Sequence, residues 1–235
     1  MCDRYVSPDS ETIERAWNLG QPAAATFERR YNVMPGAQVP VLRGEHGALF
    51  LMHARWGFIP RWWTQKKPPG NCYTARAEDA ATKPMWRDAY RTERCLVPAD
   101  GWYGWSGVER VDAKTGEVRS HRQPHFVFRP EGPVCFAGLM SLWKLEGRLP
   151  VIACAILTRE APDALSPVHP RMPLVLPPAA FRDWLDPNRR SADEMAAVIA
   201  AAIDQFTHYA VSAELTRATH EDAQFVKPIP LKSAA

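Results

Sequence analysis

Short apolar runs recur along most of the chain, and polar or turn-forming residues separate them. Apolar residues dominate the stretches QVPVLR (38–43) and ALFLMHARWG (48–57), and the turn GEHG joins them. Similar runs follow at residues 94–105, 125–129, 133–145, 149–158 and 206–212. Runs of this length predict the strands of an antiparallel or mixed sheet. The charged, glycine-containing stretch 106–123 is expected to form a solvent-exposed loop or a hairpin.

Fewer segments have the spacing and the end signals of helices. Helices are expected at residues 10–18, 83–94, 177–186 and 191–203. Ser10 is the expected N-cap of the first, and Pro84 suits the first position of the second. Ser191 and Glu194 have the spacing of a capping box at the start of the fourth. Strands that come mostly in runs, with few helices, predict a single α+β domain over residues 1–235.

Composition narrows the class of protein. The chain has 46% hydrophobic and 23% charged residues, as soluble globular proteins do, and no apolar run is long enough to span a bilayer. The five cysteines form no CxxC pair and have no metal-ligand spacing with the seven histidines. We therefore expect a cytoplasmic protein with buried thiols and with no bound metal, cofactor or membrane. The formal net charge of +3 permits an anionic partner without requiring one.

The chain opens with MCDRY, which places a cysteine directly after the initiator methionine. Removal of Met1 would leave Cys2 with a free α-amine next to its thiol. The amine titrates at about 8 and the thiol at about 8.5, so both nucleophiles are partly available near neutral pH. The alternative is that Cys2 is an incidental residue at a frayed terminus.

Two adjacent tryptophans follow a proline in WGFIPRWW. Successive side chains of an extended chain point to opposite sides, so Trp62 and Trp63 cannot both face one core. At least one is expected at the surface, where an aromatic ring beside Arg61 suits stacking on single-stranded nucleic acid. The alternative is a tryptophan that packs against the rim of the domain.

A proline-bounded loop, SPVHPRMPLVL, carries His169 and Arg171 ahead of an apolar strand. The prolines restrict the loop and would hold both side chains in place. An imidazole can transfer protons near neutral pH, and a guanidinium offers several donors to a phosphate. A structural role for either residue remains the alternative.

Taken in order, these stretches resemble one family. They are MCDRY, YNVMPG, WGFIPRWW, TARAED, KPMWRDAYRTERCLVPADGWYGW and HPRMPLVL, and they extend from Cys2 to about Leu176. Together the chain resembles the SOS response-associated peptidase (SRAP) family of abasic-site-processing proteins. The resemblance implies a curved, half-barrel-like core of antiparallel or mixed strands, flanked by short helices.

The resemblance also implies a reaction with DNA. The α-amine of Cys2, exposed by autoproteolytic removal of Met1, would attack the aldehyde of an abasic site in single-stranded DNA and form a Schiff base. The thiol would then close a thiazolidine ring, which gives a DNA–protein crosslink that shields the lesion. An activity like that of an abasic-site lyase is a further implication. A monomer that associates with the nucleoid when bound to DNA is expected.

The resemblance assigns roles to seven further residues. Arg4, Arg76 and Arg171 match family arginines that contact DNA phosphates. Trp62 and Trp63 match an aromatic pair beside the DNA path, and His169 matches a histidine that exchanges protons with the sugar. Asn32 matches an asparagine near the N-terminal loop and is expected to orient Cys2 or the DNA strand.

The chain departs from the family pattern at three positions. Gly104 stands where the family has a glutamate that assists proton transfer, and Thr74 stands where it has an asparagine. Asp3 follows the cysteine where the family commonly has glycine. Loss of a general acid–base group costs a factor of about 10² to 10⁴ in rate, so slower or poorly reversible crosslinking is expected. Asp100 is a candidate substitute for the missing glutamate.

Two other functions fit the sequence. One is a non-covalent accessory protein that binds single-stranded DNA with a decayed catalytic centre, as the missing glutamate and asparagine would suggest. The other is a thiol hydrolase that uses Cys2 and His169, although the sequence has no identifiable oxyanion hole or orienting acid for peptide substrates.

Overall fold

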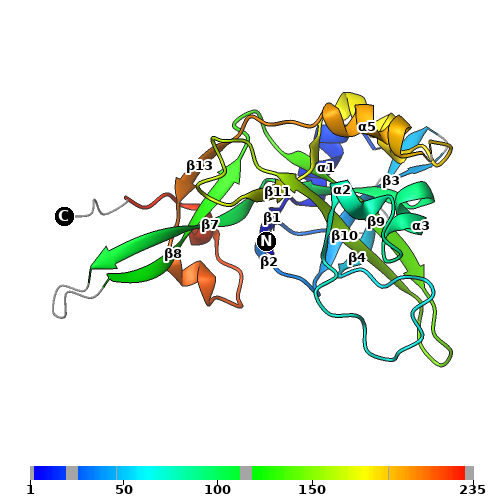
Figure 1. The fold of residues 1–235 in the computed structure, drawn as a ribbon, viewed down its shortest axis with the longest axis horizontal. Coiled ribbons are helices and arrows are strands. Elements are labelled where there is room, and N and C mark those ends of the chain that lie inside the picture. Colours follow the sequence, from blue (N-terminus) through cyan, green and yellow to red (C-terminus); the bar gives the residue numbers. More distant parts are fainter. Residues whose placement is uncertain (1–2, 20–25, 46, 112–117, 190, 231–235) are drawn as a thin grey trace.

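The computed structural model describes residues 3–19, 26–45, 47–111, 118–189 and 191–230, and two β-sheets form its core (Figure 1). The five-stranded sheet has the order β13-β8-β7-β1-β2. Its strands are β1 (Tyr5–Ser7), β2 (Arg30–Val33), β7 (Gly101–Val111), β8 (Val118–Phe128) and β13 (Thr207–Ala210). β7 and β8 form a long hairpin that extends from the body of the molecule, so the stretch left open as loop or hairpin is a hairpin.

The eight-stranded sheet curves until it meets itself. Its order is β11-β10-β4-β3-β6-β9-β12, with β5 paired to β10, and β10 also pairs with β9. The strands β10, β4, β3, β6 and β9 therefore form a closed ring, which goes further than the expected half-barrel. The strands are β3 (Gln38–Glu45), β4 (Ala48–Trp56), β5 (Thr74–Arg76), β6 (Arg94–Ala99), β9 (Val134–Trp143), β10 (Val151–Glu160), β11 (Arg171–Pro173) and β12 (Val175–Leu176).

Short helices flank the sheets, so the predicted α+β class with a curved sheet core is confirmed. The α-helices are α1 (Ser10–Trp17), α2 (Ala77–Ala80), α3 (Arg87–Thr92), α4 (Phe181–Leu185) and α5 (Ala192–Ala200). Single 3₁₀ turns are η1 (Pro178–Ala180), η2 (Ala213–Thr216) and η3 (Ala223–Val226). The predicted capping box at the start of α5 is present.

Two predicted helix starts are wrong. The N-cap of α1 is Asp9, whose carboxylate accepts the Thr12 N–H at 2.8 Å, because the Ser10 hydroxyl instead accepts the Phe27 N–H at 2.7 Å. The helix expected over residues 83–94 is shorter, since α3 begins at Arg87 and not at Pro84. The chain ahead of α3 forms turns, because Trp86 is buried there against Phe58 with ring centroids 5.1 Å apart.

Aromatic packing joins the two sheets where the chain begins. Tyr5 in β1 is fully buried and meets Trp56 and Phe136 edge-on, with ring centroids 5.3 and 5.9 Å apart. Trp102 in β7 also packs edge-on against Phe136. These contacts fix β1, a strand of the five-stranded sheet, against the closed ring. They therefore determine where the residues just before Tyr5 must lie.

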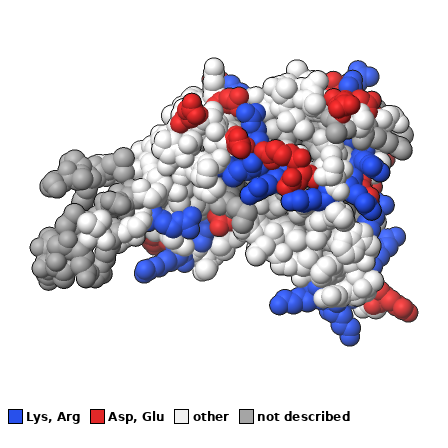
Figure 2. Space-filling view, viewed as in Figure 1, with Lys and Arg blue, Asp and Glu red and all other residues white. Residues whose placement is uncertain are grey.

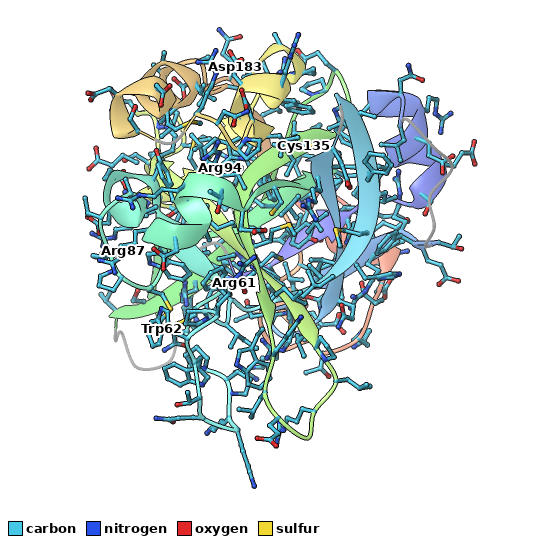
Figure 3. All side chains as sticks on the ribbon, turned by 90° about the vertical axis from the view of Figure 1, so that its right-hand side faces the viewer. Arg61, Trp62, Arg87, Arg94, Cys135 and Asp183 are labelled. Carbon is cyan, nitrogen blue, oxygen red and sulfur yellow. The ribbon has the colours of Figure 1, made fainter. Side chains whose placement is uncertain are left out.

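A buried arginine ties helices α3 and α4 to the core. Arg94 is 4% exposed, and all of its hydrogen-bond acceptors among the described residues are backbone carbonyl groups, those of Tyr90, Arg91, Trp184, Asp186 and Arg189. Figure 3 shows Arg94 in the interior, between α3 and the segment around α4. A charged donor satisfies several carbonyl groups here that water cannot reach.

Arg94→Met is therefore expected to lower the free energy of unfolding by about 3 kcal/mol, because the carbonyl groups lose their partners while the apolar volume is kept. Urea unfolding measures the loss. The exposed Arg91→Met, in α3, is the control and should change stability by about 0.5 kcal/mol or less. Equal stability of the two variants would contradict the structural role of Arg94.

Candidate functional site

Pairing of β1 with β7 places the N-terminal residues beside Gly104. Tyr5 stands opposite Trp102 and Val6 opposite Gly101, in an antiparallel register. The Tyr103 N–H donates to the Arg4 carbonyl at 3.1 Å, so the same register continues toward the terminus. Asp3 therefore faces the position of Gly104 across the two strands. Cys2, the predicted nucleophile, lies outside the described residues.

The turn that carries His169 packs directly on Gly104. The Val168 and His169 N–H groups both donate to the Leu165 carbonyl, which closes this turn. A Cβ added to Gly104 would lie 2.6 Å from Val168 Cγ1 and 3.7 Å from His169 Cβ. Real Cβ atoms essentially never approach another atom that closely, so glycine allows the turn to contact β7. Position 104 thus has no room for a side chain while Val168 occupies this place.

His169 is held in a fixed orientation. Its Nδ1 lies 3.0 Å from the backbone N and 2.9 Å from the carbonyl O of Arg171. Burial lowers the pKa of His169 and the positive charge of Arg122 lowers it further, while the backbone hydrogen bond with Arg171 and the charge of Asp3 act in the opposite direction. The imidazole is therefore mostly neutral near pH 7 and able to accept a proton. Its predicted role in proton exchange with a sugar stays a prediction.

Arg171 forms a two-pronged ion pair beside this turn. Its Nη1 and Nη2 donate to the two carboxylate oxygens of Glu78 at 2.8 and 2.9 Å, and Nη2 also donates to the Thr158 carbonyl at 2.6 Å. Burial acts against ionisation of Glu78, but the hydrogen bond and charge of Arg171 leave its pKa below the ordinary value. The pair holds the guanidinium at a fixed place at the start of β11.

A recess of about 210 Å³ brings three predicted site residues together. β5 runs parallel to β10, with Thr74 opposite Ile156 and Arg76 opposite Thr158. The recess is lined by Thr74, Ala75, Arg76, Asp79, Lys83, Trp86, Thr158 and Arg171. Acidic and basic side chains mix over α2 and β11 on this face (Figure 2). The recess therefore offers basic groups to an anion together with the hydroxyl of Thr74.

Arg4 and Asn32 instead bind the C-terminal segment. Arg4 donates to Asn32 Oδ1 at 2.9 Å and to the carbonyl groups of Leu215 and Ala218 at 2.6 and 2.9 Å. Asn32 is 2% exposed, and its amide donates to the carbonyl groups of Ala218 and His220. Both side chains thus hold residues 215–220 against β1 and β2. Their predicted contacts with DNA or Cys2 stay predictions.

The tryptophan pair borders a second recess. Trp62 is 53% exposed, which confirms that one of the pair lies at the surface, and Trp63 is half-buried with its indole N–H donating to the Lys67 carbonyl. Arg61 forms an ion pair with Glu93, and in Figure 3 Trp62 lies toward the left side of the view and Arg61 nearer its centre. This recess, of about 70 Å³, shares no lining residue with the recess around Arg76. The segment 83–86 separates the two and contributes to both.

Sequence reasoning missed or misread several residues of this region. Glu78 stands inside the motif TARAED, yet its pairing with Arg171 depends on a contact across 93 residues. Val168 has no sequence signal, since only the packed structure shows its contact with Gly104. Asp100, the candidate substitute for a glutamate, precedes β7; its Oδ2 lies 3.4 Å from Arg29 Nη2 and has no hydrogen-bond partner among the described residues.

The described residues contain no group of three or more His, Cys, Asp or Glu side chains placed to hold a metal ion. Within the same residues, no helix has both the length and the apolar character needed to cross a membrane.

Comparisons with known proteins agree with this architecture. The chain is 32% identical over 202 residues to the abasic site processing protein YedK of Escherichia coli, covering 85% of both chains. It is 30% identical over 174 residues to the abasic site processing protein YoaM of Bacillus subtilis, covering 74% of this chain and 73% of the relative. A match to the mouse abasic site processing protein HMCES, at 23% identity, covers 86% of this chain and 65% of the relative.

Solved structures share the fold. A crystal structure of a protein from Bacteroides thetaiotaomicron superposes with a TM-score of 0.79 at 16% identity, over 98% of this chain and 100% of that one. A phage-related protein of Bordetella bronchiseptica gives a TM-score of 0.65 at 27% identity, over 89% of this chain and 94% of that one. The family described as SOS response associated peptidase (SRAP) matches residues 1–218. The chain therefore belongs to the SRAP family.

Proposed function

We propose that this protein binds abasic sites in single-stranded DNA and links itself to them through Cys2 after Met1 has been removed. The observation that carries the proposal is the pairing of β1 with β7, which brings the residue next to Cys2 beside Gly104 and the His169 turn. The names of the relatives, which process abasic sites, support the same substrate.

The reaction uses two nucleophiles of one residue. The amine of Cys2 adds to the aldehyde carbon, and loss of water gives a Schiff base. The sulfur then adds to the same carbon and closes the thiazolidine ring, so one water is released overall. His169, which is mostly neutral near pH 7, accepts and returns the proton of the sugar hydroxyl as the sugar ring opens.

The recess around Arg76 and Arg171 binds the DNA backbone in this proposal. Arg171 is already fixed by Glu78, and Arg76 is exposed on β5 beside it. Phosphate contacts of this kind carry no sequence information, which suits a protein that recognises damage in any sequence.

Arg76→Met is expected to weaken binding of single-stranded DNA about tenfold and to reduce the salt dependence by about 0.7 in the slope of log K against log salt, the value of one phosphate contact. Fluorescence anisotropy at several salt concentrations measures both quantities. Arg15→Met is the matched control, because its side chain is 70% exposed on α1 and pairs only with Glu11 among the described residues. An unchanged salt slope in Arg76→Met would contradict the phosphate contact.

A second candidate is a non-covalent binder of single-stranded DNA. The packing of Val168 against Gly104 favours it, because no carboxylate can occupy position 104 in this arrangement. Such a protein would keep the basic recess and would bind intact and damaged strands alike.

Intact mass spectrometry after incubation with an abasic-site oligonucleotide distinguishes the two. The covalent proposal predicts loss of Met1 and a mass increase of one oligonucleotide less one water, stable to denaturation. An oligonucleotide whose aldehyde has been reduced to an alcohol is the control and should give no adduct. A processed protein that binds the abasic strand but shows no mass increase would establish the non-covalent function instead.

A further inference from the structure

One carboxylate oxygen of Asp3, the residue that follows Cys2 in the sequence, is closed to solvent and lacks a hydrogen-bond partner among the described residues; this oxygen is Oδ1. An unpaired carboxylate oxygen in such a place is costly, and native proteins seldom keep one without a use. Asp3 follows Cys2 in the sequence, so this oxygen belongs to the residue adjacent to the proposed nucleophile.

Strand register places Asp3 on the face that carries the His169 turn. Tyr5, Trp102 and Val168 pack in one buried cluster, and Asp3 is two residues from Tyr5 while Gly104 is two residues from Trp102. Side chains two apart in a strand point to the same face, so Asp3 and position 104 both face Val168. The charge of Asp3 acts on His169, which agrees with this placement. The carboxylate of Asp3 therefore lies opposite Gly104, a position that has no carboxylate of its own.

A second titratable side chain beside Gly104, that of His125, is already hydrogen-bonded to other residues. His125 in β8 stands opposite Gly104, on the side away from β1. Its Nε2 lies 3.1 Å from Ser106 Oγ, and its Nδ1 lies 3.3 Å from His208 Nδ1, so both ring nitrogens have partners. At 8% exposure it is also nearly closed to solvent. Asp3 is thus the carboxylate best placed to serve Cys2.

We propose that Asp3 is a general acid–base group for Schiff-base formation and ring closure, an inference that rests on the proposed function. The Asp3 carboxylate takes the proton of the Cys2 thiol and gives it to the hydroxyl of the amine–aldehyde adduct, so that the C–O bond breaks, water leaves and the C=N bond forms. The thiolate sulfur then bonds to the same carbon and closes the ring. The carboxylate is regenerated, and no other reactant is consumed.

Asp3→Asn tests this role because the amide keeps the size of the side chain and can neither take up nor release a proton. We expect the single-turnover rate of adduct formation to fall at least 100-fold, in the range of general acid–base groups. Affinity for a tetrahydrofuran abasic analogue, which has no aldehyde, should stay within about threefold, since binding does not use this proton. Intact mass establishes that Met1 is removed from the variant, and NMR titration should give a lower pKa for His169 because the nearby negative charge is gone.

Two further variants complete the test. Asp193→Asn makes the same change at an exposed position of α5 and should react at the wild-type rate, and His125→Gln should slow the reaction less than tenfold. A wild-type rate in Asp3→Asn, or an equal loss in His125→Gln, would overturn the role of Asp3. Absence of an adduct in the wild-type protein would instead reject the proposed function itself. The wild-type sample therefore tests the proposed function, and the variants test the role of Asp3.

Discussion

Replacement of Cys2 by alanine is expected to abolish the covalent product while leaving the non-covalent affinity for DNA unchanged within about twofold. Alanine keeps a free α-amine after removal of Met1 but has no thiol, so a reversible Schiff base is the last species it can form. Denaturing intact mass spectrometry should show no adduct. Adding borohydride during the incubation should recover one, because the reduced Schiff base is stable.

The loss should be complete because the other described thiols are poor substitutes. Cys95, Cys135 and Cys154 are buried in the strands, and burial raises the pKa of each, to about 12 for Cys154. Burial also raises the pKa of the half-buried Cys72. None of these residues has an adjacent free amine. Cys72→Ala is therefore the matched control and should form the adduct at the wild-type rate, whereas a denaturation-resistant adduct in Cys2→Ala without borohydride would reject the thiazolidine chemistry.

Apolar runs predicted most of the long strands, although the run 94–105 contains β6 and the start of β7, which lie in different sheets. The last run, for example, contains β13, whose residues pair with β8 in a regular register. Helix ends were harder, because tertiary contacts decide between competing caps. Ser10 and Asp9 are both good caps, and the choice follows from the bond between the Ser10 hydroxyl and Phe27, seventeen residues away.

The order of the motifs indicated the family, but it could not describe how the site is filled. Arg4 and Asn32 were expected to serve DNA, and their partners lie about 190 to 210 residues away in the C-terminal segment. No pattern in a short stretch of sequence predicts a contact over such a separation. Gly104 and Asp3 were read as two separate departures from the family pattern, and only the pairing of β1 with β7 shows that they face each other.

Gly104→Glu, which would return the family's residue to this position, is expected to damage the protein. The new Cβ would lie 2.6 Å from Val168 Cγ1, so the turn that carries His169 must move. Overpacking of this kind costs about 1 to 3 kcal/mol, and a carboxylate forced into a buried place adds a similar amount. We expect the free energy of unfolding to fall by about 4 kcal/mol and adduct formation to slow at least tenfold. Urea unfolding and single-turnover kinetics measure the two effects.

Gly107→Glu is the matched control, because this exposed glycine lies on the same strand and an added Cβ would meet nothing within 4 Å. It should leave stability within about 0.5 kcal/mol of wild type. Equal stability of the two glutamate variants would contradict the contact between Gly104 and Val168.

The double variant Gly104→Glu, Val168→Ala tests whether adduct formation needs a carboxylate at position 104. Alanine removes the clashing Cγ1, so the two changes should be less harmful together than their sum, by about 2 kcal/mol in a double-mutant cycle. If Asp3 already supplies the acid–base group, a glutamate at position 104 only adds a second negative charge beside it. The rate of adduct formation then stays at or below that of wild type. A double variant that reacts faster than wild type would show that the chain lacks a carboxylate at this place, and that Asp3 does not replace it.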